Sequence, residues 1–182
     1  MGWLVSMTTQ HIYWTDIEST GLVPGKDIIL EVSVCVTTLD ALYDSLGETH
    51  MVLGIDRIPD CDPFVRNMHS QNGLWSECLM SGLGLRELEA ELLRLPGLSE
   101  KPILAGASVH FDASFLKYFC PMFGKQLHHK VLDTSAVKLF CRSLGMPELD
   151  KDPNPCHRTD EDVDSAMRAL AECTVWLRKN RF

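Results

Sequence analysis

Residues 12–22 constrain the fold of this 182-residue chain most strongly, with the sequence Ile-Tyr-Trp-Thr-Asp-Ile-Glu-Ser-Thr-Gly-Leu. Their first half is apolar on both faces, which is typical of a strand in a sheet covered by helices. Because side chains alternate along a strand, Asp16 and Glu18 point to the same side, about 7 Å apart along the backbone. Such a pair repels unless a cation lies between the carboxylates, and oxygen ligands favour a hard divalent ion. The alternative is a strand that runs out into a polar turn with both carboxylates solvated.

Length and composition limit the classes of protein to consider. The chain is long enough for one domain with a sizeable core, and its 45% hydrophobic and 23% charged residues are those of a globular protein. A net charge of −8 argues against a basic surface for long duplex nucleic acid, whose binding depends on phosphate neutralisation. Seven cysteines without a C-x-x-C pair indicate reduced thiols and a cytoplasmic location. No segment has the apolar length needed to span a membrane.

The order of the predicted elements indicates a mixed α/β sheet. We expect a single domain over residues 11–182 behind a flexible extension at residues 1–10. The first three expected strands have short connections, so we expect them to form an antiparallel meander. Strands are expected at residues 11–17, 28–38, 48–55, 102–107 and 131–132, helices at residues 85–95, 112–119, 133–144 and 160–178, and irregular structure at residues 60–80. A meander followed by alternating strands and helices predicts five strands, the last two parallel, with helices on both faces.

Two more acidic residues stand where predicted helices begin. Asp112 follows a core strand, a position where Asp commonly caps a helix. Asp162 forms a capping-box pattern with Thr159, so each residue has an ordinary structural role available. The predicted order nevertheless places all the acidic positions at one end of the sheet, where α/β folds bind ligands. We therefore expect a metal site formed by four carboxylates: Asp16, Glu18, Asp112 and Asp162.

Three motifs of the chain resemble those of the DEDDh 3′→5′ exonucleases, whose fold is ribonuclease H-like. They are Asp16-x-Glu18, Asp112 within Ser-Val-x-x-Asp-x-x-Phe-Leu, and His157 five residues before Asp162. Asp164 is the main competitor of Asp162 for the last position, ahead of Asp160 and Glu161.

Within that superfamily the sequence is most similar to the oligoribonucleases. The similarity lies in the opening motif at residues 14–22, in Met-His-Ser-Gln-Asn-Gly-Leu at residues 68–74, and in Leu-Asp-Thr-Ser at residues 132–135. The likeness extends over about residues 11–178, nearly the whole chain.

The resemblance implies an exonuclease that releases nucleoside 5′-monophosphates from short single strands, RNA before DNA. Two divalent cations, Mg²⁺ or Mn²⁺, would serve such hydrolysis, and oxygen ligands without a Cys or His cluster suit them. His157 would act as the general base, since an unperturbed His titrates near working pH. Its ordinary alternative is a surface His before a helix. The family also implies a homodimer in which residues near 128–135 reach across.

Six residues are candidates for substrate contacts: Leu22, His69, Trp75, Ser108, Lys130 and Ser135. Leu22 would wedge against a base, and Trp75 or His69 would stack on one, although Trp75 fits a hydrophobic core equally well. By resemblance, Ser108, Ser135 and Lys130 surround the 5′ phosphate of a very short RNA. Lys130 stands where the family has Arg, and a lysine lacks the planar fork with which Arg grips two phosphate oxygens. His129 stands where the family has Tyr.

Two other functions remain open from the sequence. A DNA-directed proofreading or repair exonuclease would use the same carboxylates. A non-catalytic nucleotide-binding module of α/β type is disfavoured, because the loop after the first strand lacks a G-x-G-x-x-G phosphate cradle.

Overall fold

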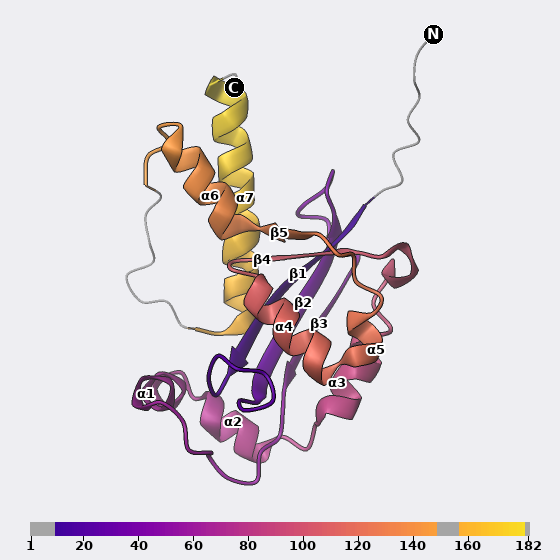
Figure 1. Ribbon diagram of the computed structural model, residues 1–182, viewed down its shortest axis with the longest axis vertical. Coiled ribbons are helices and arrows are strands. Elements are labelled where there is room, and N and C mark those ends of the chain that lie inside the picture. The colour runs from indigo at the N-terminus through magenta and orange to yellow at the C-terminus, as the bar shows by residue number, and fades with distance from the viewer. Residues whose placement is uncertain (1–9, 149–156, 181–182) are drawn as a thin grey trace.

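A five-stranded mixed sheet forms the centre of the protein in the computed structural model, which describes residues 10–148 and 157–180 (Figure 1). Its strands are β1 (His11–Ser19), β2 (Ile29–Thr38), β3 (Gly47–Val52), β4 (Ile103–Gly106) and β5 (Val131–Asp133), in the order β3-β2-β1-β4-β5. β1 and β3 pair antiparallel with β2, whereas β4 pairs parallel with β1 and β5. The predicted meander followed by two parallel strands is confirmed. The extension predicted at residues 1–10 lies, apart from Gln10, outside the described residues.

Helices cover both faces of the sheet. On one face, Tyr13 and Ile17 of β1 pack with buried residues of α3 (Leu85–Leu92), α4 (His110–Phe119) and the short α5 (Pro121–Gly124). On the other face, Ile12 and Trp14 pack on α7 (Thr159–Asn180), the long yellow helix of Figure 1. The alternation of side chains along β1 therefore divides the core into two halves.

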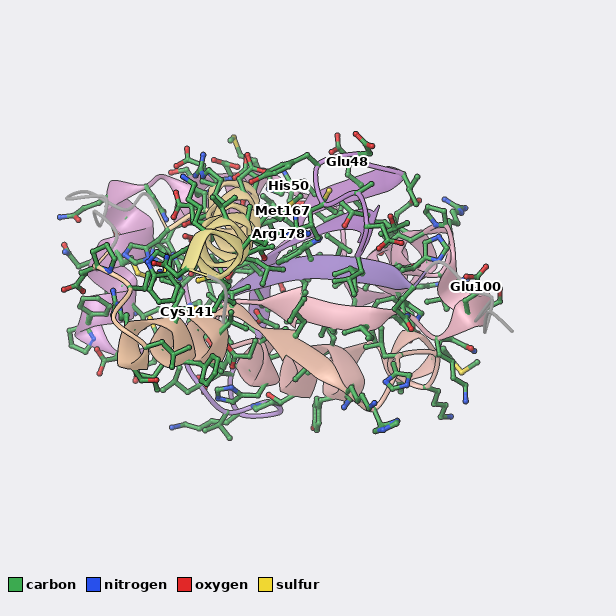
Figure 2. The ribbon with its side chains drawn as sticks, turned by 90° about the horizontal axis from the view of Figure 1, so that it is seen from above. Glu48, His50, Glu100, Cys141, Met167 and Arg178 are labelled. Carbon is green, nitrogen blue, oxygen red and sulfur yellow. The ribbon has the colours of Figure 1, made fainter. Side chains whose placement is uncertain are left out.

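The helix α6 (Thr134–Ser143) packs against α7, and the two lie side by side in both ribbon views (Figure 1, Figure 2). Cys141 of α6 and Cys173 of α7 meet in this contact. None of the helices in the described part of the chain is long and apolar enough to cross a membrane.

The expectation that residues 60–80 are irregular is wrong, because this segment forms α1 (Pro63–Gln71) and α2 (Leu74–Met80). The Asp62 carboxylate accepts a hydrogen bond of 2.8 Å from the Phe64 N–H, and Pro63 occupies the first turn, so α1 begins with two strong start signals. Only His69 of α1 is buried, which leaves little apolar periodicity to reveal the helix. α2 begins after Gly73, whose φ of +80° favours glycine.

Candidate active site

β1 presents two carboxylates on the face of the sheet that α7 covers. Asp16 and Glu18 share their parity with Ile12 and Trp14, which pack on α7, so all four side chains point the same way. Glu18 is only 8% exposed, and Asp16 is half-buried. The predicted pair therefore stands at the end of β1 facing the first turn of α7.

The segment that begins α7 brings two further predicted residues to this pair. Glu18, His157 and Asp162 each offer a ligand atom, and these atoms all lie within 4.8 Å of one another. The His157 backbone has a φ of +50°, and its carbonyl accepts a hydrogen bond of 2.8 Å from Asn72 Nδ2. Asp164 instead lines a separate cavity with Cys35 and is exposed. Of the two competing carboxylates, Asp162 is the one beside Glu18.

Asp112 reaches the same group from α4. It lies in the first turn of that helix, is 2% exposed, and its carboxylate is hydrogen-bonded to the backbone of Ile17. The helix is capped at Val109 without a side-chain hydrogen bond, so Asp112 does not serve as the cap. Its charge and that of Asp16 repel each other, which places the two carboxylates in one electrostatic cluster.

Burial, with repulsion from neighbouring carboxylates, raises the pKa of all four carboxyl groups. Burial and then Asp162 raise the pKa of Asp16 from its ordinary 3.8 to about 7. Burial, followed by Asp16 and Asp162, raises the pKa of Glu18 from 4.5 to about 9. Burial also raises the pKa values of Asp112 and Asp162, although His157 partly offsets the rise at Asp162. Buried carboxylates gathered in this way are the donor set that a hard divalent cation prefers, so these residues fit such an ion.

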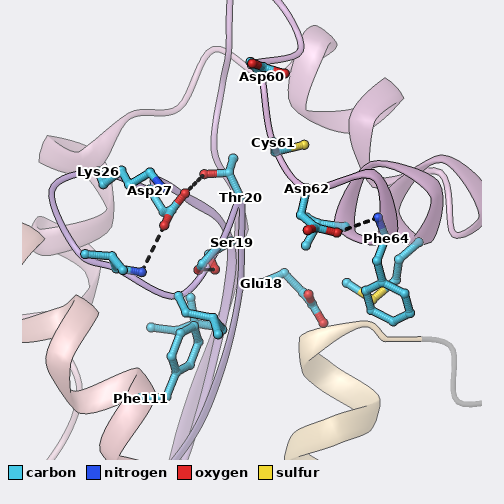
Figure 3. A pocket seen from close by; sticks show the side chains of 16 residues that line it. Glu18, Ser19, Thr20, Lys26, Asp27, Asp60, Cys61, Asp62, Phe64 and Phe111 are labelled. Atoms are coloured by element: carbon cyan, nitrogen blue, oxygen red, sulfur yellow. Dashed lines mark hydrogen bonds between the residues drawn. The ribbon is translucent and has the colours of Figure 1, made fainter.

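Two cavities open beside the carboxylates. The larger has a volume of about 830 Å³ and is lined by residues that include Glu18, Leu22, Phe64 and Phe111. Figure 3 shows its side chains, with the Glu18 carboxylate directed toward the start of a neighbouring helix. The second, of about 560 Å³, is lined by Leu22 and Phe111 again, together with Asp16 and other residues. Leu22 is 78% exposed and borders both cavities, as a wedge between two bases requires.

The stacking role predicted for Trp75 or His69 is wrong. Trp75 is 3% exposed, packs with Leu30 and Cys78, and donates a hydrogen bond of 3.0 Å from Nε1 to the Arg66 carbonyl. His69 is fully buried and meets Trp75 edge-on with ring centroids 5.2 Å apart. Neither ring has a face open to a base.

His69 instead packs against the backbone and side chain of the end of β1, beside Glu18. Its Nε2 lies 3.2 Å from the Ser19 carbonyl oxygen and 3.6 Å from Glu18 Oε2. Burial lowers the pKa of His69, which favours the neutral ring. The neutral ring donates to the carbonyl and leaves the Glu18 carboxylate without a charged partner at this point.

The predicted phosphate cluster is brought together only in part. Ser108 Oγ and Ser135 Oγ lie 3.5 Å apart, and Asp133 Oδ1 accepts the backbone N–H of Ser108 at 3.1 Å and of Ser135 at 2.9 Å. Lys130 is exposed just before β5 and is not among the described residues that line the two cavities.

Phe64 is a residue of the site that the sequence reasoning missed. Phe64 is 70% exposed and lines the larger cavity on the side opposite Phe111 (Figure 3). The available signal was Asp62-Pro63, which starts α1 and fixes Phe64 in the first turn.

The sheet order β3-β2-β1-β4-β5, with helices on both faces, is that of a ribonuclease H-like exonuclease fold. Solved structures share this fold. Exonuclease I of E. coli in complex with a 5cy-dT13 oligonucleotide superposes with a TM-score of 0.67 at 16% identity, over 96% of this chain and 42% of that chain. Exonuclease I from Methylocaldum szegediense gives a TM-score of 0.62 at 17% identity, over 93% and 40%. The chain thus spans about two fifths of the exonuclease I chains.

Curated relatives identify the family, although no family model matches the sequence. The mitochondrial oligoribonuclease of Bos taurus is 31% identical over 170 residues, which cover 88% of this chain and 70% of the relative. The oligoribonuclease of Corynebacterium glutamicum is 31% identical over 180 residues, covering 91% and 79%. The chain belongs to the oligoribonuclease family and is an enzyme of the 3′→5′ exonuclease class.

Proposed function

We propose that this protein hydrolyses short single-stranded RNA from its 3′ end to nucleoside 5′-monophosphates, with two divalent cations and His157 as general base. The observation that carries the proposal is the meeting of Glu18, His157 and Asp162, whose ligand atoms lie within 4.8 Å of one another beside an open cavity. Asp16 and Asp112 complete the carboxylate set. The names of the relatives favour RNA as the substrate.

The cations would be held by Asp16, Glu18, Asp112 and Asp162. When bound, the ions activate the nucleophile and neutralise charge on the scissile phosphate. His157 accepts the proton that the attacking water loses, since it stands at the edge of the carboxylate cluster. Its backbone is held by the Asn72 hydrogen bond, which limits the positions the ring can take.

Two neighbouring cavities support a substrate of few nucleotides. The 3′-terminal base would lie in the larger cavity on the ring of Phe64, and Leu22 would separate it from the next base. Ser108 and Ser135 would meet the 5′ phosphate, with Lys130 as their cationic neighbour. Lys supplies a point charge where Arg would supply a fork, so we expect a weaker preference for the shortest strands.

A homodimer is part of the proposal. Val131 of β5, within the segment 128–135, is 43% exposed, and Leu139 and Phe140 of the following helix α6 are 70% and 58% exposed. Exposed apolar side chains on these consecutive elements favour a protein contact.

A cytoplasmic location also stays a prediction, and the relatives include mitochondrial proteins.

Hydrolysis of 5′-labelled RNA of two, five and twenty residues, beside DNA of the same sequences, tests the function. We expect faster hydrolysis of the short RNAs, stepwise loss from the 3′ end, and no reaction with a chelator present. Equal or faster hydrolysis of DNA would favour a DNA-directed proofreading or repair enzyme. Binding without hydrolysis at any Mg²⁺ or Mn²⁺ concentration would contradict an enzyme and favour a nucleotide-binding module.

A further inference from the structure

A fifth carboxylate, Glu31, lies directly behind the acidic cluster. It pairs with Glu18 across the antiparallel β1–β2 ladder and is fully buried. Like charges directly opposite each other destabilise a strand pair, and a buried carboxylate is costly unless it is paired. The charge of Glu31 also contributes to the raised pKa values of Asp16, Glu18 and Asp162. The site therefore needs a cation at Glu31.

Arg158 supplies that cation and joins two elements in doing so. Its Nε donates to both oxygens of Glu31 at 2.9 and 3.1 Å, and its Nη2 donates to Oε1 at 2.7 Å. The opposite side of the guanidinium holds Glu77 of α2, through Nη1 at 2.8 Å and Nη2 at 2.9 Å. We call Glu31, Arg158 and Glu77 the arginine clamp. It connects β2, α2 and the chain entering α7.

Arg158 of the clamp lies in the sequence between His157 and Asp162, the two predicted functional residues of this segment. Arg158 follows His157 directly, and its carbonyl accepts the Asp162 N–H at 3.1 Å in the first turn of α7. Two neighbouring contacts hold the same turn, since the Thr159 N–H donates to Glu31 Oε2 at 3.3 Å and Thr159 Oγ1 lies 2.7 Å from Ser33 Oγ. A shift of Arg158 therefore moves both His157 and Asp162 relative to Glu18.

We propose that Arg158 is a positioning residue, which through the arginine clamp sets the distance of Asp162 from Glu18, with His157 beside them, and so controls metal affinity. The inference rests on the proposed function for the roles of His157 and Asp162. The guanidinium also engages both oxygens of Glu31, which keeps this carboxylate out of the metal site. A planar fork bound on two sides does this better than the point charge of a lysine.

Calorimetric titration with Mn²⁺ of the parent protein and of Arg158→Lys tests the proposal. Lysine keeps the positive charge and loses the fork, and outer-shell changes typically cost about 10–100-fold in metal affinity, so we expect a Kd about tenfold higher. The matched control is Arg142→Gln, which breaks the Arg142–Glu148 pair of 2.9 Å elsewhere in the chain. Its Kd should stay within about twofold of the parent value.

The titration separates positioning from folding. Partial unfolding lowers the number of sites per chain, whereas displaced ligands raise the Kd of the sites that remain. A Kd for Arg158→Lys within about twofold of the parent overturns the proposal. Should Arg158→Lys fail to fold, Glu77→Gln decides, because it leaves the Glu31–Arg158 pair intact. We then expect about a threefold higher Kd, and an unchanged Kd overturns the clamp.

Hydrolysis of a dinucleotide, measured in the same proteins, keeps the two proposals apart. We expect Arg158→Lys to need more Mn²⁺ for half-maximal rate with little change in the dinucleotide KM. A parent protein that binds Mn²⁺ in a clamp-dependent way but cleaves no RNA refutes the proposed function and leaves the clamp standing. A parent that cleaves RNA with the same Mn²⁺ requirement as Arg158→Lys refutes the clamp alone.

Discussion

The metal-free protein should lose stability as the pH rises, and a divalent cation should reverse the loss. The reason lies in Glu18 and Asp16, whose pKa values burial and mutual repulsion raise to about 9 and about 7. In the unfolded chain these groups return to their ordinary pKa values of 4.5 and 3.8. Between these limits the folded state holds more protons than the unfolded state, so the free energy of unfolding falls with pH. The full contribution is present below about pH 4 and is lost by about pH 9.

The size of the effect follows from the same groups. One pKa unit corresponds to about 1.4 kcal/mol, so the rise at Glu18 taken alone amounts to roughly 6 kcal/mol. Part of that rise is repulsion from Asp16 and Asp162, which protonation of any one of the three relieves. We therefore expect the free energy of unfolding to fall on the order of 3 kcal/mol between pH 5 and pH 8.5. This is a large share of the total stability of a typical domain.

Urea unfolding followed by tryptophan fluorescence, in the presence of a chelator, measures this slope. The matched control is the double variant Asp16→Asn, Glu18→Gln, which removes two of the four carboxyl groups with raised pKa values and should make the fall with pH clearly shallower. Millimolar Mg²⁺ or Mn²⁺ should restore stability at pH 8.5 and have little effect at pH 5. A chelated parent protein whose stability stays constant or rises over this range would refute the electrostatic account of the site.

Three further predictions concern single residues. His157→Ala should keep Mn²⁺ binding and lose about 10²–10⁴-fold in turnover, as expected for a general base, and a loss below about threefold would make the residue structural. Asp162→Asn should abolish most hydrolysis, whereas Asp164→Asn should stay near the parent rate, because Asp164 lines the separate cavity beside Cys35. The opposite result would show that Asp164 is the metal ligand. Phe64→Ala should raise the dinucleotide KM by about tenfold, since base stacking is worth about 1–3 kcal/mol, and an unchanged KM would remove Phe64 from the substrate site.

The sheet was predictable because its strands carry their own signals. β1 and β2 are rich in β-branched and aromatic residues and are buried along almost their whole length, and the short connections leave an antiparallel meander as the simple arrangement. α1 was not predictable from periodicity, because a helix that buries only His69 has almost no apolar face. The start of α1 depends on Asp62, whose carboxylate accepts the Phe64 N–H. Such a cap involves two or three residues and leaves no periodic pattern in the sequence.

The candidate site was likewise predictable only in part. The shared side of Asp16 and Glu18 follows from strand alternation, and their meeting with Asp162 follows from the order of elements. The exposure of an aromatic ring does not follow from its residue type: Trp75 is covered by the packing of α2 on Leu30. The contact of Arg158 with Glu31, 127 positions away, depends on the strand register and on how the chain enters α7.

The most direct test of the central claim is the hydrolysis of a 5′-labelled five-residue RNA by the parent protein and by Asp112→Ala. With Mg²⁺ or Mn²⁺, the parent should shorten the RNA one residue at a time from the 3′ end. Asp112→Ala should remain folded, because removing a buried carboxylate relieves repulsion, and should react roughly a thousandfold more slowly. A variant that degrades the RNA at the parent rate, or a parent that cuts the strand internally, would contradict a carboxylate-held metal site for 3′→5′ hydrolysis.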